Sequence, residues 1–238
     1  MAPHGEGSEE AMVVQDENRK PISSILIVIA MQTEAMPVVN KFQLKEDLDP
    51  VFPKGVPWVR YHGVYKDLHI NLVWPGKDLT LGVDSVGTIS ASLVTYAAIQ
   101  ALQPDLIINA GTAGGFKVFD LYGVGSRQSF STPNLLKELN LKAGKLSTGD
   151  SLDMSPQDEA SIVANDATVK DMEGAAVAYV ADLLKVPAIF IKAVTDIVDG
   201  DKPTAEEFLQ NLAAVTAALD QAVAQVVDFI SGKCLSEL

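Results

Sequence analysis

The stretch Ser24-Ile25-Leu26-Ile27-Val28-Ile29-Ala30 decides the fold class of this chain. It is an unbroken apolar run rich in β-branched residues, which is typical of a strand buried on both faces of a parallel sheet. Residues 106–110 and 188–194 repeat the pattern. The three runs therefore predict an α/β fold in which these strands lie buried in one sheet.

Segments with helical or alternating spacing separate and follow the buried strands. Apolar residues at helical spacing predict helices over residues 89–102, 173–184 and 204–230. Alternating polar and apolar residues over 58–74 predict a β-hairpin. Pro104 is expected to end the first helix, because the residue before a proline disfavours the helical conformation.

The chain divides into two regions by composition. Residues 1–20 are acidic and show no apolar periodicity, so we expect a disordered acidic tail there. Residues 21–238 contain no internal repeat or low-complexity segment, and we expect them to form one domain.

The charge balance argues against polyanionic partners. The 238 residues include 18 Lys and Arg against 31 Asp and Glu, which gives a net charge of −13. Nucleic acids and anionic membrane surfaces attract basic proteins, so neither is an expected partner. The longest strongly apolar run, residues 25–31, is too short to span a bilayer. The single Cys234 and the lack of a signal-like N-terminus predict a cytoplasmic protein.

Three acidic residues stand at the expected ends of strands or starts of helices: Glu34, Glu173 and Asp196. Ligands of open α/β sheets bind beyond the carboxyl ends of the strands, where these side chains should converge. Each residue alone has a structural explanation, since carboxylates also cap turns and favour helix N-termini. Their convergence on one sheet edge is what favours a functional site.

A glycine-rich segment, Gly111-Thr112-Ala113-Gly114-Gly115, follows the second buried strand. We expect it to form a turn from the strand into a loop or helix, where the backbone can approach a ligand closely. It is neither a dinucleotide-binding fingerprint nor a P-loop, so neither cofactor class is predicted. The three His and one Cys lack metal-ligand spacing, so no metal site is predicted either.

Four motifs in order resemble the 5′-methylthioadenosine/S-adenosylhomocysteine nucleosidases, most of all their plant members. They are Ile29-Ala30-Met31-Gln32-Thr33-Glu34, Asn109-Ala110-Gly111-Thr112-Ala113-Gly114-Gly115, Asp171-Met172-Glu173-Gly174-Ala175-Ala176 and Val194-Thr195-Asp196. The similarity covers nearly all of residues 23–238. It implies a three-layer purine nucleoside phosphorylase-type α/β fold with a central mixed sheet, and a homodimer.

The resemblance also implies a reaction, in which the N-glycosidic bond of 5′-methylthioadenosine is hydrolysed to adenine and 5-methylthioribose. S-adenosylhomocysteine is a second candidate substrate, the process served is methionine salvage, and no cofactor is required. By resemblance, Glu34 is the general base that activates water and Asp196 is the acid that protonates purine N7. The residues implied in substrate binding are Met31, Thr112, Leu152, Lys170, Asp171, Met172, Glu173 and Phe208.

Within that set, the resemblance gives several residues a particular place. Glu173 and Met172 match the ribose site, and Thr112 matches a hydroxyl near the sugar and the water. Leu152 and Phe208 match positions that border the purine, although Phe208 also fits the core stripe of the last helix.

Nucleoside cleavage itself calls for two carboxyl groups with different tasks. The sugar becomes oxocarbenium-like while the purine gains negative charge, so one group must activate water and the other must donate a proton. An acid such as Asp196 has to hold its proton near neutral pH, which a dry pocket with neighbouring carboxylates favours.

Two other functions remain open at this point. Phosphorolysis needs cationic or amide donors beside the sugar, and residues 83–88 contain no Arg or Lys, so hydrolysis is preferred. A nucleoside-binding or interaction protein without catalysis is the second alternative. Three retained acids argue against it, because buried carboxylates are costly unless they are paired or used.

One departure from the family pattern follows Gly115. The residues Gly115-Phe116-Lys117-Val118 run directly into Phe119-Asp120-Leu121-Tyr122-Gly123, so a strand and its loop are expected to be missing. Each buried hydrogen bond left unmade costs about 1–3 kcal/mol, against a net stability of about 5–15 kcal/mol for a typical domain. We therefore expect weakened activity, and a preference for methylthioadenosine, whose 5′ tail is short.

Overall fold

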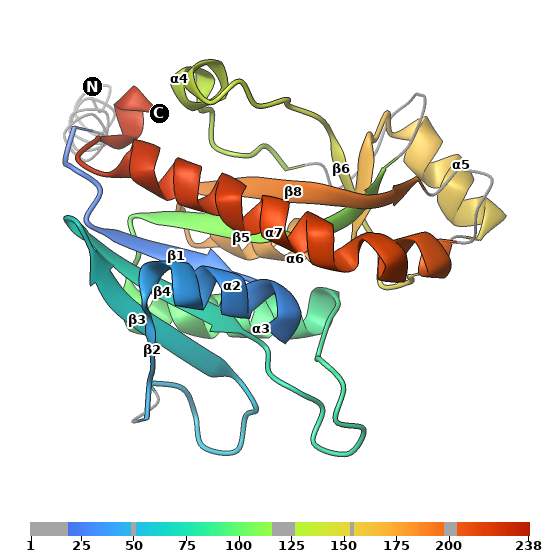
Figure 1. Ribbon diagram of the computed structural model, residues 1–238, viewed down its shortest axis with the longest axis horizontal. Coiled ribbons are helices and arrows are strands. Elements are labelled where there is room, and N and C mark those ends of the chain that lie inside the picture. The colour runs from blue at the N-terminus through green and yellow to red at the C-terminus, as the bar shows by residue number, and fades with distance from the viewer. Residues whose placement is uncertain (1–18, 49–50, 116–126, 153–154, 198–203) are drawn as a thin grey trace, which may run out of the picture.

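The computed structural model describes residues 19–48, 51–115, 127–152, 155–197 and 204–238 (Figure 1). Eight strands and six α-helices lie in the described part of the chain, with a short 3₁₀ helix near the C-terminus. In chain order the elements are β1 (Ser24–Val28), α2 (Gln32–Phe42), β2 (Lys45–Glu46), β3 (Val59–Tyr65), β4 (Leu68–Trp74), α3 (Thr88–Leu102), β5 (Leu106–Gly115), α4 (Pro133–Glu138), β6 (Leu146–Thr148), α5 (Pro156–Ala164), β7 (Val169–Asp171), α6 (Gly174–Leu183), β8 (Ala188–Ile197), α7 (Thr204–Ile230) and η1 (Leu235–Glu237).

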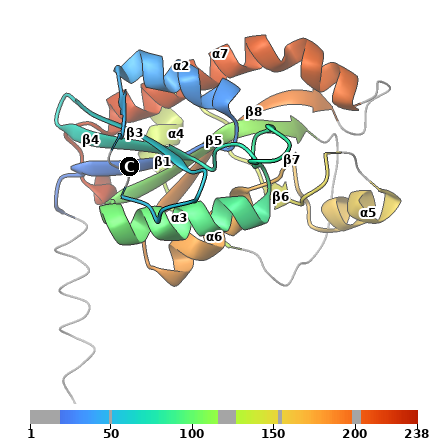
Figure 2. The same cartoon turned by 90° about the horizontal axis from the view of Figure 1, so that it is seen from below.

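The strands form one mixed sheet in the order β2-β3-β4-β1-β5-β7-β6, with β8 paired to β5. The β1 strand is parallel to β4 and β5, and β8 is parallel to β5, whereas β3 is antiparallel to β4 and β7 to β5. Figure 2 shows α2 and α7 on one face of the sheet and α3 and α6 on the other. The predicted three-layer α/β fold with a central mixed sheet is confirmed.

The β1 strand contributes to the core on both of its faces. Its alternate residues Ile25 and Ile27 lie in the apolar cluster that includes α2 and α7 side chains. Leu26 and Val28 lie in the cluster that includes α3 and α6 side chains. The unbroken apolar run is therefore explained, because neither face of this strand meets water.

Most predicted elements are confirmed with small changes at their ends. The hairpin is β3 and β4, paired in antiparallel register from Val59 opposite Trp74 to Tyr65 opposite Leu68. The three predicted helices are α3, α6 and α7. The α3 helix ends at Leu102, as predicted, and the left-handed Gln103 caps it before Pro104.

The glycine-rich segment differs from the prediction, because it continues the strand and does not form a turn. The β5 strand pairs with β8 as far as Gly115, and its last two residues also pair with β7 on the other edge. Pairing with β8 along residues 111–115, and with β7 at the last two of them, holds the segment in an extended form despite its glycines. A register shift relative to β8 occurs between Ala113 and Gly114.

The predicted deletion falls at residues 116–126, which lie outside the described residues, so its position stays a prediction. In the described part of the chain, β8 forms its strand pairing with β5 alone. At the first residue of β8, the Ala188 carbonyl accepts from the Phe130 N–H over 2.8 Å. The predicted acidic tail also lies outside the described residues, except for Arg19 and Lys20.

The α7 helix is 27 residues long and packs along β8, β5 and α2. Its length and apolarity also meet the requirement for a membrane span. Its inner side chains from Leu219 to Ile230 are buried in the cluster that contains β1, however, which is the packing of a core helix. Nearer its start, Phe208, Leu212 and Val215 are only half-buried, so the predicted apolar stripe is fully covered in its second half alone.

Truncating the buried part of this stripe should destabilise the protein. Leu219 is fully buried, whereas Leu209 on the same helix is 71% exposed. Leu219→Ala should lower the free energy of unfolding by about 2–5 kcal/mol through lost burial and a residual cavity. Leu209→Ala, the matched control, should change it by no more than about 0.5 kcal/mol. Urea unfolding compares the two; equal losses would contradict the packing of α7.

Candidate active site

Glu34 lies in the first turn of α2, directly after β1 and near the carboxyl end of β5. Its Oε1 accepts two hydrogen bonds from Thr112, at 2.7 Å from the backbone N–H and at 2.8 Å from the hydroxyl. Its Oε2 accepts from the Met31 N–H over 3.4 Å. The structure thus joins three predicted site residues, with the carboxylate fixed between two elements.

Burial and hydrogen bonding act on Glu34 in opposite directions. The side chain is buried, and burial raises the pKa of Glu34 above its usual value. The hydrogen bonds from Thr112 and the nearby ammonium of Lys192 favour the ionised form and lower the pKa of Glu34. Such a group can take a proton at a pH nearer neutrality than an exposed carboxylate can.

Glu173 directly precedes α6, and its Oε1 accepts from the Gly87 N–H over 2.9 Å. Burial raises the pKa of Glu173 to about 7; Lys192 and the Gly87 N–H lower it, while the charges of Asp171 and Glu34 raise it. Gly87 has φ of 101°, a conformation that favours glycine. The loop before α3 therefore contributes to the position of Glu173.

Lys192 of β8 is the site residue that sequence reasoning missed. Its Nζ lies 2.7 Å from Asp171 Oδ2, and the two side chains are 7% and 0% exposed. The same Oδ2 accepts from the Gly174 N–H over 2.8 Å, and Oδ1 accepts from the Thr148 hydroxyl over 2.6 Å. Asp171, a predicted substrate-binding residue, is enclosed and anchors the ammonium and the start of α6, and its contact with a substrate stays a prediction.

We call Glu34, Asp171, Glu173 and Lys192 the carboxylate cluster. Gly111 of β5 shows how close two of its members are. A Cβ built at Gly111 would lie 3.5 Å from Lys192 Nζ and 3.7 Å from Glu34 Oε1. The charges of Glu34, Asp171 and Lys192 all act on Glu173. The predicted convergence of Glu34 and Glu173 at one sheet edge agrees with these contacts.

Asp196 stands near the end of β8, opposite Gly114. Its Oδ1 accepts from the Thr195 hydroxyl over 2.6 Å, while its buried Oδ2 has no hydrogen-bond partner among the described residues. Burial raises the pKa of Asp196; the Thr195 hydroxyl lowers it, Glu207 raises it and Lys170 lowers it. A carboxyl with a raised pKa, and with one oxygen unpartnered among the described residues, suits a proton donor to a ligand.

The remaining predicted site residues surround these groups less closely. The buried Lys170 donates to the Leu152 carbonyl over 3.3 Å and also to the Ser151 carbonyl. The Leu152 side chain is 46% exposed. Met172 and Phe208 are half-buried. No described contact brings Leu152 or Phe208 into the carboxylate cluster, so their places beside a purine stay predictions.

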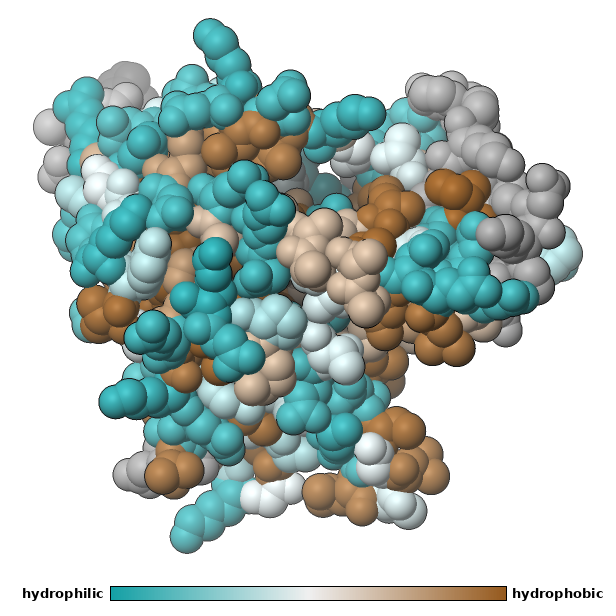
Figure 3. Space-filling view, viewed as in Figure 1, coloured by the Kyte–Doolittle hydropathy of each residue, from teal (hydrophilic) through white to brown (hydrophobic). Residues whose placement is uncertain are grey.

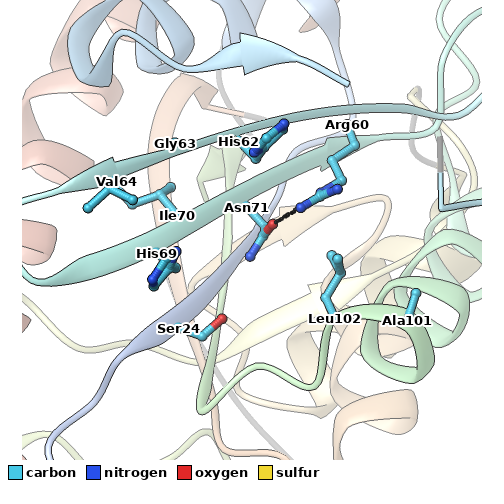
Figure 4. Close-up of a pocket in the computed structure, with 10 residues that line it drawn as sticks. All are labelled: Ser24, Arg60, His62, Gly63, Val64, His69, Ile70, Asn71, Ala101 and Leu102. Atoms are coloured by element: carbon cyan, nitrogen blue, oxygen red, sulfur yellow. Dashed lines mark hydrogen bonds between the residues drawn. The ribbon is translucent and has the colours of Figure 1, made fainter. Parts of the chain in front are cut away.

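A separate hollow lies at the opposite ends of the strands (Figure 4). His62, His69 and Ser24 line it, but its one guanidinium is already engaged. Arg60 donates to Asn71 Oδ1 over 2.8 Å and pairs with Asp47 at 2.5 Å. Among the described residues, no group of three or more His, Cys, Asp and Glu has an arrangement that could hold a metal ion.

The fold and this site define a class of protein. The sequence model of the phosphorylase superfamily matches residues 24–122 and 127–228, which is most of the chain. A 5′-methylthioadenosine/S-adenosylhomocysteine nucleosidase of Helicobacter pylori has the same fold, with a TM-score of 0.69 at 20% identity over 88% of this chain and 100% of that one. The protein is thus a member of the phosphorylase superfamily.

Closer relatives define the family within that class. A 5′-methylthioadenosine nucleosidase of Arabidopsis thaliana is 62% identical over 267 aligned positions that cover 100% of both chains. A solved apo structure of such an Arabidopsis enzyme has a TM-score of 0.89 at 65% identity, over 92% of this chain and 100% of that one. The chain belongs to the 5′-methylthioadenosine/S-adenosylhomocysteine nucleosidase family.

The comparison with the Arabidopsis relative also supports a shortened chain. The alignment has 267 positions and this protein has 238 residues. The alignment therefore leaves 29 positions without a residue of this chain. The match to the superfamily is interrupted between residues 122 and 127. The 29 positions agree in size with a missing strand and loop, whose place in the chain stays a prediction.

The buried Glu173 should make stability fall as pH rises. Its pKa is about 7 in the folded protein against 4.5 for an ordinary Glu. The folded state holds this proton more tightly, so its stabilisation is present below about pH 4.5 and lost as the pH rises through about 7. Between about pH 5 and about pH 8, the loss of unfolding free energy should be smaller in Glu173→Gln than in the wild type by about 1–3 kcal/mol.

Urea unfolding at both pH values measures this difference. Glu159→Gln, at an exposed position of α5, is the matched control and should keep the wild-type dependence on pH. An unchanged slope in Glu173→Gln would show that Glu173 titrates normally.

Proposed function

We propose that this protein hydrolyses the N-glycosidic bond of 5′-methylthioadenosine to adenine and 5-methylthioribose, in methionine salvage. The observation that carries the proposal is the buried carboxylate of Glu34, held on Thr112 beside Lys192. The full-length identity to nucleosidases of Arabidopsis supports the choice of substrate. S-adenosylhomocysteine is the second substrate to consider, because a relative 61% identical to this chain carries both names.

The described groups divide the work of hydrolysis between them. Glu34 takes the proton of the attacking water, and its hydrogen bonds from Thr112 fix the direction in which it acts. Asp196 donates to purine N7 through the oxygen that has no hydrogen-bond partner among the described residues. Glu173 holds the sugar hydroxyls through the oxygen that does not accept from Gly87. Burial of all three strengthens the electrostatic contribution to catalysis.

The charges of the carboxylate cluster favour water over phosphate as the nucleophile. Lys192 is the cation that phosphorolysis would need, but Asp171 already pairs with it at 2.7 Å. Glu34 and Glu173 are its other charged neighbours. A phosphate dianion placed there would meet more negative than positive charge, whereas a neutral nucleoside and a water molecule would not.

A second candidate function is nucleoside binding without efficient turnover. The 29 positions that this chain lacks relative to an Arabidopsis nucleosidase favour it. The single described strand partner of β8 favours it as well, because Asp196 stands on that strand. Loss of a neighbouring strand would loosen the acid while leaving Glu34 and Glu173 in place.

We also propose a homodimer in the cytoplasm. Exposed apolar side chains at helical spacing on α3, Ile89, Leu93 and Tyr96, present one face to solvent. Leu79 and Leu81, in the loop before α3, are 83% and 74% exposed. Figure 3 shows apolar side chains on this projecting loop, at lower right. Apolar patches of this kind mark protein interfaces, and a second copy of the chain is the partner proposed.

Incubation with methylthioadenosine should release adenine, measured by liquid chromatography. Glu34→Gln and Asp196→Asn should each lower kcat by about 100-fold or more, because each removes a proton-transfer group. Glu46→Gln, an exposed carboxyl on β2, is the matched control and should be unaffected. The kcat/KM for methylthioadenosine should exceed that for S-adenosylhomocysteine.

The sugar product separates the competing reactions. Added inorganic phosphate should leave the rate unchanged and yield free methylthioribose; a phosphorylated sugar would establish phosphorolysis. Binding of methylthioadenosine with no adenine above the background of Glu34→Gln would establish the binding protein instead.

The α3 patch is tested through the oligomeric state. Ile89→Asp combined with Leu93→Asp should reduce the mass in solution from twice the chain mass of 25.4 kDa to that of one chain. Leu209→Asp introduces a carboxylate at an equally exposed apolar site on α7 and should leave the dimer intact. Size-exclusion chromatography with light scattering measures both. A monomeric wild type would contradict the proposal.

A further inference from the structure

Lys192 is a buried cation in the interior of a sheet strand. Its side chain is 7% exposed, and its backbone lies opposite Gly111 in the pairing of β5 with β8. An ammonium without a partner is too costly to bury, so its surroundings must compensate for lost hydration. Apolar residues of similar volume often replace buried ion pairs without loss of stability, so folding alone does not explain a lysine here.

Three elements fix the position of the ammonium through Asp171. This carboxylate ends β7 and accepts hydrogen bonds from Thr148 of β6 and from the Gly174 N–H at the start of α6. Both of its oxygens are therefore held before it meets Lys192. Held in this way, Asp171 directs the ammonium to one place and leaves it little freedom to follow another partner.

The Lys192 ammonium is held beside Glu34. Lys192 Nζ and both oxygens of Glu34 lie within 4 Å of the point that a Cβ would occupy at Gly111. Because glycine has no side chain, no protein atom of residue 111 fills that point. The cation and the carboxylate therefore act on one another across a short gap at the strand.

Three charged groups from three parts of the chain lie around Lys192 of β8. They are Glu34 of α2, Asp171 of β7 and Glu173 before α6. The ammonium lowers the pKa of Glu34 and of Glu173 against the effect of burial, whereas Asp171 and Glu34 raise the pKa of Glu173. Lys170 and Glu207 act on Asp196, at the other side of the site.

We propose that Lys192, anchored by Asp171, is a positioning residue that keeps Glu34 in its carboxylate form, ready to take a proton from water. The role rests on the proposed hydrolysis, because only a base needs to be ionised before the reaction. The ammonium acts through Glu34 and does not itself contact the substrate in this proposal. The pKa of Glu173, by contrast, is raised to about 7, because burial outweighs the effect of the same ammonium.

Replacing Lys192 by Met tests the proposal, since Met keeps the length of the side chain and removes the charge. In Lys192→Met, the acidic limb of kcat/KM against pH should move to higher pH by at least about one pH unit, which is a tenfold loss of activity on that limb. Lys192→Arg should restore the wild-type limb, because the guanidinium stays charged. Lys66→Met removes a lysine from its ion pair with Asp228, away from the cluster, and should leave the limb unchanged.

A second readout does not depend on turnover. The carboxylic acid stretch in the infrared spectrum, taken as the difference between each protein and its Glu34→Gln counterpart, follows the protonation of Glu34. In Lys192→Met the acid band should persist to a pH at least about one unit higher than in the wild type. If the wild type releases no adenine, the proposed hydrolysis fails while this titration still decides the role of Lys192.

Two results would overturn the proposal. One is an unchanged acidic limb and an unchanged infrared titration in a folded Lys192→Met; the other is a limb that Lys192→Arg fails to restore. If Lys192→Met does not fold, the combination with Asp171→Asn removes both charges of the pair and avoids an unpaired buried carboxylate. That variant also lacks the ammonium, so the same shift of Glu34 is expected, and its absence counts equally against the proposal.

Discussion

The pairing of β5 on both of its edges is the constraint on which the rest of the structure depends. In its first half, apolar residues such as Ile107 and Ile108 are fully buried between β1 and β8, and they supply both faces of the core. In its second half, the strand continues without large side chains and pairs with β7 and β8. One strand thus contributes to the core at one end and lies beside the carboxylate cluster at the other.

The electrostatics of the carboxylate cluster, beside the second half of β5, follow from that arrangement. Three buried acids share one buried ammonium, so they cannot all be ionised at low cost. The three acids differ in their hydrogen-bond partners. Both oxygens of Asp171 accept hydrogen bonds, Glu34 accepts from Thr112, and Glu173 accepts from a single backbone N–H. Chemically similar groups thereby stand in different surroundings, and differences of this kind are the general way in which carboxyl pairs divide acid and base roles.

Much of the fold could be predicted because the spacing of apolar residues indicates which faces of each element are buried. The run 24–30 alternates between two apolar clusters, and the hairpin over 58–74 has the expected antiparallel register. The glycine segment after Ala110 could not be predicted as a strand, since its extended form comes from hydrogen bonds to β7 and β8 and not from its own side chains. Local propensity is overridden there by tertiary pairing.

The candidate site was predicted in part. Motifs located Glu34, Thr112 and Glu173, and the structure connects them to one cluster. Lys192 was missed although a signal existed, because it is the one charged residue within the apolar run 188–194. The enclosure of Asp171 could not be read from the chain, since its partners Thr148 and Lys192 are remote in sequence and meet it only after the sheet has formed.

Gly111 shows what kind of constraint such a site places on the sequence. Its φ is not among the positive values that favour glycine, and an added Cβ would meet its neighbours at ordinary contact distances. An alanine would therefore fit both the backbone and the packing. What it would remove is the small volume between the Glu34 carboxylate and the Lys192 ammonium. The position is restricted by the space beside these two charged groups, so a variant there would keep the fold and still fill the gap between them.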